Sequence, residues 1–360
     1  MNPASFDRPN NYGVYKMKST FIDACKRQKT PYYPVWFMRQ AGRFLPGYQK
    51  IRKRHSFIEM LKTPELITEV TMEPIHVLGV DAAIIFSDIL TLPDLMGMKL
   101  DYVDGRGPFF ESAVSTEADV KRLHDIEPSM LSFLTDAIRL IVSCDAVPLI
   151  VFVGSPLTTA LYMMEGGHQR NFLGAFKRIF SDVDFYRRLA ERLVRASIQY
   201  LSHQIDAGAS AVQIFDSYGE MLTKEDAFTL SLPYIKDIVQ AIKAAYPHIP
   251  VILFSKGTAS YFDEIISFIG ADVYNPDWVM DLARLERPAR DYAIQGNLNP
   301  LTLFAGISDI QSRVRSIIDR IRQPGYIFNV GHGLNPEIDY VKLRDVVQFI
   351  HELPVHFEPL

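Results

Sequence analysis

Two arginines, Arg39 and Arg43, stand four positions apart at the end of an apolar run that begins at Pro34. From Arg39 to Ile58 the chain carries six fixed positive charges and no Asp or Glu, although its formal net charge is −4. Like charges at such short range repel one another unless an anion or solvent relieves the repulsion. Arginines directly behind a core strand would also be costly to leave without a partner. This segment therefore predicts an anion-binding site.

Other polar side chains follow other apolar runs of the chain. Asp88 ends one such run, Ser217 follows another, and His332 stands between two glycines. Asp88 alone could be a helix cap or a turn residue, and His332 could be an ordinary loop histidine. Flanking glycines let backbone and ligand approach closely, which favours a functional role for His332. Lys256 keeps an aldolase-type Schiff base open as a weaker alternative, whereas no G-x-S-x-G elbow supports a serine hydrolase around Ser217.

The elements that must position these side chains are eight short apolar runs, each typical of a strand buried on both faces. They span residues 35–38, 82–86, 149–153, 211–215, 251–254, 272–274, 292–295 and 326–330. Amphipathic helical stretches lie between them, including residues 64–78, 190–207 and 235–245. Strands that alternate with helices imply right-handed crossovers, so the chain is predicted to be an α/β protein, a single-domain (β/α)8 TIM barrel over residues 17–360. A doubly wound open sheet is the alternative, weakened because no G-x-G-x-x-G follows the first strand.

Three local features complete the predicted organisation. Residues 95–111 do not fit the alternation and predict an insertion after the second strand, with an extra strand at 98–103 and a turn at 105–108. Thr63 is expected to cap the helix at 64–78. Residues 1–16 have neither the basic nor the apolar region of a signal peptide and are expected to be a flexible tail.

Composition narrows the function classes further. The chain has 360 residues, 48% hydrophobic and 22% charged, which is enough to bury a large core. The mild negative charge argues against a nucleic-acid partner, and no apolar run approaches the length of a membrane span. Cys25 and Cys144 cannot build a disulfide framework or a cysteine zinc site. We therefore expect a cytoplasmic protein.

The segment at 34–43, PVWFMRQAGR, closely resembles the signature of the uroporphyrinogen decarboxylase family. Further segments resemble the family's other blocks, in the family's order: residues 81–90, 162–167, 213–217, 295–300 and 328–333. The resemblance implies a single-domain barrel that forms a homodimer and uses no metal or organic cofactor. It also implies removal of CO2 from the four acetate side chains of uroporphyrinogen III to give coproporphyrinogen III, a step of porphyrin and heme biosynthesis.

The resemblance places the family's substrate-site residues on Arg39, Arg43, Arg52, Asp88, Tyr162, Ser217 and His332. Among them, the expected catalytic residues are Arg39, Asp88, Tyr162 and His332. Arg52, Tyr162 and Ser217 are named mainly because of the resemblance, since Tyr162 by itself would be a core aromatic residue. The other basic residues of the arginine segment, Lys50, Lys53 and Arg54, are expected on a solvated helix face.

The implied chemistry explains why these residue types are needed. Loss of CO2 from an acetate on a pyrrole leaves a carbanion, and prior protonation of the ring creates a cationic sink for its electrons. Asp88 is expected to accept hydrogen bonds from pyrrole N–H groups and stabilise that charge. Arg39, Arg43 and His332 are expected to bind carboxylates. Arg39 as the proton donor is a hypothesis, because a guanidinium is a poor general acid.

Two alternatives remain open at this point. A zinc-dependent corrinoid methyltransferase of the same fold needs a His/Cys zinc set, which neither Cys25 nor Cys144 is placed to supply. A non-catalytic tetrapyrrole- or polyanion-binding protein would bind the porphyrinogen and release no CO2.

Overall fold

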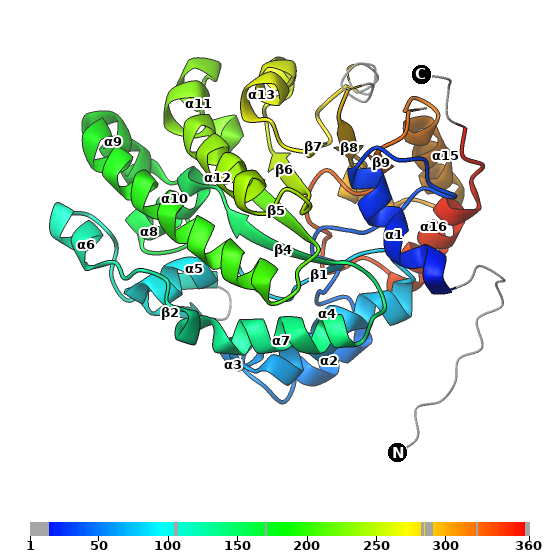
Figure 1. The fold of residues 1–360 in the computed structure, drawn as a ribbon, viewed down its shortest axis with the longest axis horizontal. Helices are drawn as coiled ribbons and strands as arrows, with labels where there is room; N and C mark the ends of the chain where they lie inside the picture. The colour runs from blue at the N-terminus through cyan, green and yellow to red at the C-terminus, as the bar shows by residue number, and fades with distance from the viewer. Residues whose placement is uncertain are drawn as a thin grey trace.

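The computed structural model describes residues 14–103, 107–169, 171–281, 284, 291–321 and 323–356 (Figure 1). Its centre is a seven-stranded sheet in which neighbouring strands follow the order of the chain, and every pairing is parallel. The strands are β1 (Ala83–Ile84), β4 (Leu149–Gly154), β5 (Ala211–Asp216), β6 (Val251–Ser255), β7 (Val273–Pro276), β8 (Ala293–Gln295) and β9 (Tyr326–Ile327). This order is the one expected of strands joined by crossover helices.

The predicted first strand, residues 35–38, is not a strand of this sheet. Only Val35 pairs, in a parallel bridge to Phe328. Beyond that point side chains replace the backbone ladder, as where the Met38 N–H donates to Asn329 Oδ1 at 3.1 Å. The described residues therefore form seven strands of the main sheet where eight were expected, because the N–H groups of Val35, Phe37 and Met38 bond to side chains and not to a neighbouring strand.

Helices follow the strands along the chain. Their bounds are α1 (Val14–Cys25), α2 (Pro46–Arg52), α3 (Phe57–Lys62), α4 (Pro64–Leu78), α5 (Thr91–Pro93), α6 (Glu117–Arg122), α7 (Ser132–Ser143), α8 (Pro156–Glu165), α9 (Leu173–Ser181), α10 (Val183–Asp206), α11 (Lys224–Leu230), α12 (Leu232–Ala245), α13 (Phe262–Ile269), α15 (Ile307–Ile318) and α16 (Tyr340–Glu352). Neighbouring outer helices pack in pairs, such as α4 with α7 and α10 with α12, while α1 packs against β9. No helix in the described parts of the chain is long and apolar enough to span a bilayer.

Helix α4 confirms the predicted bounds of 64–78 and ends at Gly79, whose φ of 75° is readily adopted by glycine. The expected cap was wrong in its chemistry, because the Thr63 hydroxyl donates to the Glu59 carbonyl at 2.8 Å and makes no capping bond to α4. The preceding helix α3 takes the expected kind of cap instead, since Ser56 Oγ accepts from the Glu59 N–H at 3.1 Å.

The predicted helices at 190–207 and 235–245 lie within α10 and α12, both of which begin earlier than expected. Asp182 starts α10 by accepting a hydrogen bond from the Phe185 N–H at 3.0 Å. Carboxylates in this position satisfy an otherwise unpaired amide of the first turn. Asp182 is therefore the residue in the sequence that marks the start of α10. It lies before the stretch in which the apolar residues recur most regularly.

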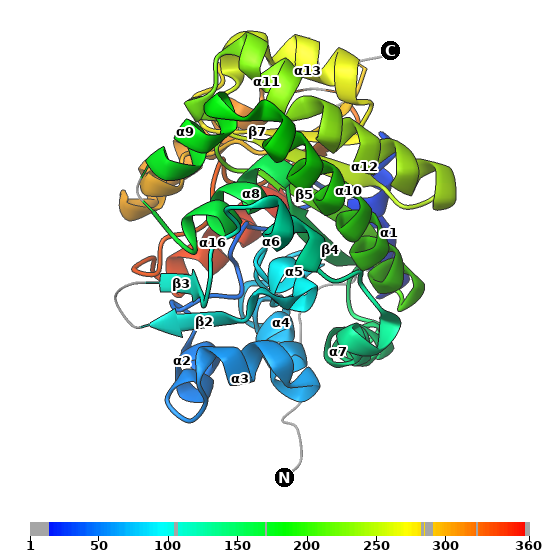
Figure 2. The same ribbon diagram turned by 90° about the vertical axis from the view of Figure 1, so that its left-hand side faces the viewer.

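The insertion predicted at 95–111 forms an antiparallel hairpin of β2 (Leu100–Val103) and β3 (Gly107–Phe110). Figure 2 shows this hairpin apart from the main sheet, and its strand β2 packs against α3. The extra strand predicted at 98–103 is confirmed as β2. The predicted turn at 105–108 lies partly outside the described residues, and its Gly107 and Pro108 belong to β3. The predicted N-terminal tail also lies outside them up to residue 13.

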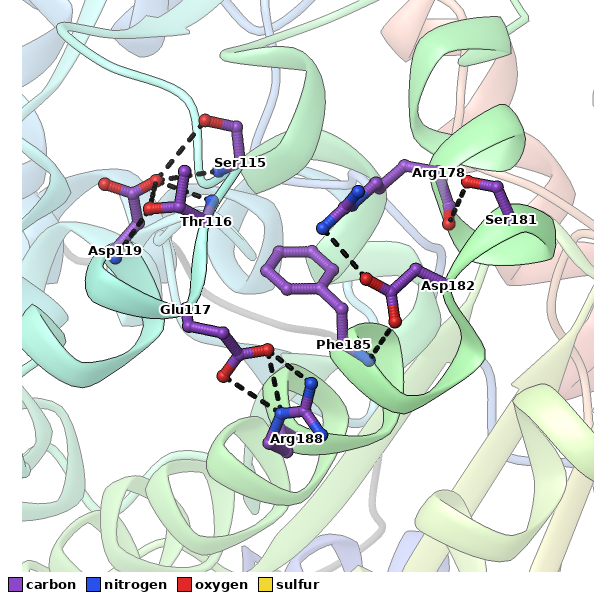
Figure 3. A network of polar contacts seen from close by, with 9 residues as sticks. All are labelled: Ser115, Thr116, Glu117, Asp119, Arg178, Ser181, Asp182, Phe185 and Arg188. Atoms are coloured by element: carbon purple, nitrogen blue, oxygen red, sulfur yellow. Dashed lines mark hydrogen bonds and ion pairs between the residues drawn. The ribbon is translucent and has the colours of Figure 1, made fainter.

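Downstream of the hairpin, α6 is fastened to α10 by polar contacts (Figure 3). Thr116 and Asp119 cap α6 with reciprocal hydrogen bonds. The Glu117 carboxylate accepts from Arg188 Nε at 2.8 and 2.9 Å. Each exposed ion pair stabilises the fold only slightly, but together these contacts fix where the chain leaves the hairpin.

The interior of the sheet contains a hydrogen-bonded polar layer. The Trp36 indole N–H donates to Gln295 Oε1 at 2.8 Å, and Gln295 Nε2 donates to Asn275 Oδ1 at 2.7 Å and to Gln213 Oε1 at 3.3 Å. All four side chains are fully buried. Because buried polar groups need partners, this layer ties the arginine-bearing segment to β5, β7 and β8.

Candidate active site

A cavity of about 470 Å³ lies where the strands of the sheet end, the face that carries the chemistry in folds of this kind. Five of the predicted site residues line it: Arg39, Arg43, Asp88, Ser217 and His332. Its apolar wall includes Phe57, Phe86, Phe152, Phe215 and Phe254. The cavity therefore combines cations, one carboxylate and a broad aromatic surface.

Arg39 is held at this cavity by its backbone and by a close approach to Gly333. Its φ of 63° is in the left-handed region, which costs a non-glycine residue on the order of 1–3 kcal/mol. A Cβ at Gly333 would lie 2.3 Å from Arg39 Cδ and 2.6 Å from Nε. The arginine stem thus runs along the backbone of a glycine next to His332.

Arg39 and Arg43 are both exposed at the cavity, which corrects the argument that they are buried behind a core strand. Neither forms an ion pair with an acidic side chain of the described residues. Exposure removes the desolvation cost that the sequence argument relied on. The two guanidinium groups are instead available to an anion that enters the cavity.

Asp88 is half-buried and lies both in a turn and at the cavity. Its Oδ1 accepts from the Leu90 N–H at 2.8 Å, which makes it a turn residue. It also lines the cavity. Burial raises the pKa of the Asp88 carboxyl, and the Leu90 N–H, the Tyr102 hydroxyl and the Arg39 charge partly offset that rise.

His332 is neutral in the empty cavity near pH 7. Burial lowers its pKa to about 4, and the positive charges of Arg39 and Lys256 lower it further in the same direction. Its ring meets those of Phe254 and Trp278 edge-on, with centroids 6.1 and 5.9 Å away. A neutral imidazole can still donate one N–H to a carboxylate, but it contributes no positive charge until an anion is present.

Tyr162 stands behind the cavity and does not line it. Its hydroxyl lies 2.8 Å from the hydroxyl of Tyr218. Burial raises the pKa of Tyr162, with further contributions from Tyr218 and Asp88, while Arg39 opposes the rise. Tyr162 is therefore within electrostatic range of the two central charges. Ser217 does line the cavity, and its backbone N–H is held by Thr158 Oγ1 at 3.1 Å.

Arg52 lies in a second cavity, of about 670 Å³, whose other lining residues include Lys99, Tyr102 and Phe57. Its Nη1 donates to the His55 carbonyl at 3.1 Å. Phe57 lines both cavities, so they are neighbours. The structure thus places Arg52 in a cavity that shares Phe57 with the one lined by the other predicted substrate residues except Tyr162.

The structure of this site does not support the Schiff-base aldolase or the zinc-dependent methyltransferase considered from the sequence. Lys256 pairs with Glu220 at 2.5 Å, and an ion-paired ammonium has no lone pair with which to form a Schiff base. Cys25 and Cys144 are both free thiols. Among the described residues, no three His, Cys, Asp or Glu side chains are grouped as a metal site.

Sequence reasoning missed the aromatic wall and two tyrosines, Tyr102 and Tyr218. Phe86, Phe215 and Phe254 are the last residues of three predicted strands and were taken as core. A signal was present, since the last side chain of such a strand lies at the rim where ligands bind. Tyr102 offered no comparable signal, because its place depends on how the hairpin docks.

Comparisons with known proteins agree with this geometry. A family model described as "Uroporphyrinogen decarboxylase (URO-D)" matches residues 16–353. A protein of Thermodesulfovibrio yellowstonii named uroporphyrinogen decarboxylase is 39% identical over 337 residues, covering 93% of this chain and 98% of the relative. One of Geobacter sp. (strain M21) with the same name is 41% identical over 343 residues, covering 94% and 99%.

The solved structures show the same fold at much lower identity. A methyltransferase from Methanosarcina mazei has a TM-score of 0.75 at 14% identity, covering 94% of this chain and 98% of its own. At that identity the likeness concerns the fold alone. A family match over nearly the whole chain, together with relatives near 40% identity, decides membership: the chain belongs to the uroporphyrinogen decarboxylase family.

Proposed function

We propose that this protein catalyses the cofactor-independent decarboxylation of the four acetate side chains of uroporphyrinogen III, giving coproporphyrinogen III and CO2. Family membership supports the reaction. The observation that carries the site is one cavity that unites Asp88, Arg39 and Arg43 against a phenylalanine wall. Such a cavity suits a macrocycle with apolar ring faces and carboxylates at its rim.

Asp88 is the proposed partner of the macrocycle nitrogens. A half-buried carboxylate that lines the cavity can accept their N–H groups and stabilise positive charge as a pyrrole ring is protonated. Arg39 and Arg43 bind substrate carboxylates through their forked N–H groups, and His332 adds one N–H donor. Arg39 stays the candidate for delivering the proton.

Ser217, Tyr162 and Arg52 have supporting places in the proposal. Ser217 offers a hydroxyl at the cavity, and Tyr162 fixes the local field around Asp88 through its bond to Tyr218. Arg52, in the adjoining cavity, receives a carboxylate arm that extends past Phe57.

The test is an anaerobic assay that follows coproporphyrinogen formation and substrate binding in parallel. Removing one well-placed charge-stabilising group from an active site costs about 10²- to 10³-fold in kcat. We expect Asp88→Asn to bind substrate and to lose turnover on that scale, and Arg39→Lys to lose binding as well. Normal turnover by Asp88→Asn would contradict the role of Asp88. A wild-type protein that binds the porphyrinogen without releasing CO2 would instead be the non-catalytic carrier.

We also propose that the sheet closes into a complete eight-stranded barrel. The segment before Arg39 supports this, because the Phe328 N–H donates to the Pro34 carbonyl at 2.8 Å and the Asp81 N–H donates to the Val35 carbonyl at 2.8 Å. The segment therefore bonds to the chain beside β9 on one side and beside β1 on the other. It occupies the position of an eighth strand between the two edges.

We propose that the protein is a cytoplasmic homodimer, as the family resemblance implies. The exposed apolar side chains of Leu301 and Phe304 support a partner surface, with 62% and 46% of their surface accessible. The free thiols of Cys25 and Cys144 support a reducing compartment. Sedimentation at several concentrations tests the dimer.

A further inference from the structure

The β2–β3 hairpin is built into the wall next to the site, although the proposed function uses none of its residues. The Phe110 N–H donates to the Gly166 carbonyl at 2.9 Å, and the His168 N–H donates to the Pro108 carbonyl at 3.1 Å. These bonds fix β3 to the chain that follows α8, whose last turn carries Tyr162. The hairpin is thus fastened by its backbone next to the helix of one catalytic candidate.

On strand β2, a series of ring contacts from Tyr102 through Phe57 to Phe86 links the hairpin to the segment of Asp88. The Tyr102 ring meets the Phe57 ring edge-on with centroids 4.5 Å apart, and Phe57 meets Phe86 at 5.8 Å. Phe86 is two residues before Asp88, and both line the cavity. The position of the Tyr102 ring is therefore fixed relative to the segment that carries Asp88.

The Tyr102 hydroxyl acts on the pKa of Asp88, yet it makes no hydrogen bond of ordinary geometry. Its oxygen is buried, and no described group accepts a hydrogen bond of ordinary length and angle from it. Leaving a buried hydroxyl unpaired costs free energy, so such a group in a folded protein calls for an explanation. The charge that acts on it most strongly is Asp88, which raises the pKa of the Tyr102 hydroxyl beyond the effect of burial.

We propose that Tyr102 is a positioning residue for Asp88, whose hydroxyl donates to the Asp88 carboxylate once substrate fills the cavity. The inference rests on the proposed role of Asp88. The donated hydrogen bond orients the carboxylate toward the macrocycle nitrogens and keeps it ionised in a site that otherwise favours the neutral acid. The hairpin then contributes to the reaction without touching the reacting atoms.

Several charged and titratable groups face this pair from the elements around it. Arg39 lowers the pKa of Asp88, in the same direction as Tyr102. Asp94 and Tyr162 act on Tyr102, and Asp88 also acts on the buried Tyr200. None of these groups changes when only the Tyr102 hydroxyl is removed, so that substitution isolates its effect.

The test variant is Tyr102→Phe, which keeps the ring and its contact with Phe57. Without the donor, the pKa of Asp88 in the substrate complex rises, so the acidic limb of the kcat profile should move to higher pH by at least half a unit. We expect kcat to fall about 3- to 30-fold. Thermal stability should stay the same or rise, because a buried unpaired hydroxyl is lost.

Tyr261→Phe is the matched control. Its hydroxyl is also buried without a hydrogen-bond partner among the described residues, and burial together with Asp216 raises its pKa to about 12. It does not act on Asp88. We expect this variant to keep the wild-type pH profile and kcat.

An unchanged pH profile in Tyr102→Phe overturns the inference, as does an equal shift in Tyr261→Phe. The Asp88→Asn assay separates this failure from that of the proposed function. If Asp88→Asn is inactive and Tyr102→Phe behaves as wild type, only the role of Tyr102 is wrong. If Asp88→Asn turns over normally, the proposed role of Asp88 is wrong, and the inference falls with it.

Discussion

Replacing Gly333 by Ala tests whether the placement of Arg39 matters for function. The new Cβ would lie 2.3 Å from Arg39 Cδ, 2.6 Å from Nε and 2.7 Å from Cγ, all far inside van der Waals contact. The obstructing atoms belong to a side chain that is exposed at the cavity, so Arg39 can rotate away at little cost to the fold. We therefore expect a change below about 1 kcal/mol in the free energy of unfolding.

Binding should respond much more strongly than stability. A displaced guanidinium loses a charge-assisted contact to a substrate carboxylate, worth about 1.5–3 kcal/mol. At 1.4 kcal/mol per factor of ten, KM should rise about 10- to 150-fold. Steady-state kinetics and urea unfolding of the same preparation measure both quantities.

The control is Gly306→Ala, where the nearest atom to a new Cβ, Asp309 Oδ2, is 3.8 Å away. This variant should keep the wild-type KM. If Gly333→Ala also keeps the wild-type KM while remaining folded, Arg39 does not bind substrate from the position described, and the reasoning is refuted.

Two further outcomes follow from buried groups. The pKa of His332 is about 4 in the folded protein against ~6.5 when unfolded, so the unfolded chain binds a proton first as pH falls. The stability contributed by this group is therefore fully present above pH ~6.5 and is lost toward pH 4, by on the order of 2–3 kcal/mol. Urea unfolding at pH 7 and pH 4.5 should show this loss. The loss should be smaller in His332→Gln. Trp36→Phe removes the donor to Gln295 within the polar layer and should destabilise the protein by about 2–4 kcal/mol. A value below 0.5 kcal/mol in urea unfolding would mean that this hydrogen bond is not important for stability.

Most of the sheet could be predicted from the sequence because buried parallel strands are short continuous apolar runs, and such runs are easy to recognise. The segment at Val35 was misjudged because three of its N–H groups bond to side chains, and one of these side chains, Asn329, lies near the other end of the chain. No local pattern records a partner at that distance. The same holds for Gly333, whose closeness to Arg39 depends on bringing β9 beside the signature segment.

The site likewise contains features that the sequence could predict and features that depend on the fold. The residues that come together at the cavity each follow an apolar run, and their positions along the chain were enough to predict this. They are Arg39, Arg43, Asp88, Ser217 and His332. The low pKa of His332 could not be predicted, since it arises from burial and from charges that the fold brings near. Tyr102 was hidden for a similar reason, because its neighbours Phe57 and Asp88 meet it only in the folded hairpin.

The buried polar layer has a consequence for how the chain can be divided. A cut between β5 and β6 leaves Trp36 and Gln213 on one piece and Asn275 and Gln295 on the other. Each piece then holds amide and indole groups whose partners lie on the other, in surroundings that exclude water. Neither piece is self-sufficient, so two separately produced fragments should be soluble and ordered only when they are brought together. The hydrogen bonds that fix the interior thus make the two pieces on either side of this cut depend on each other for folding.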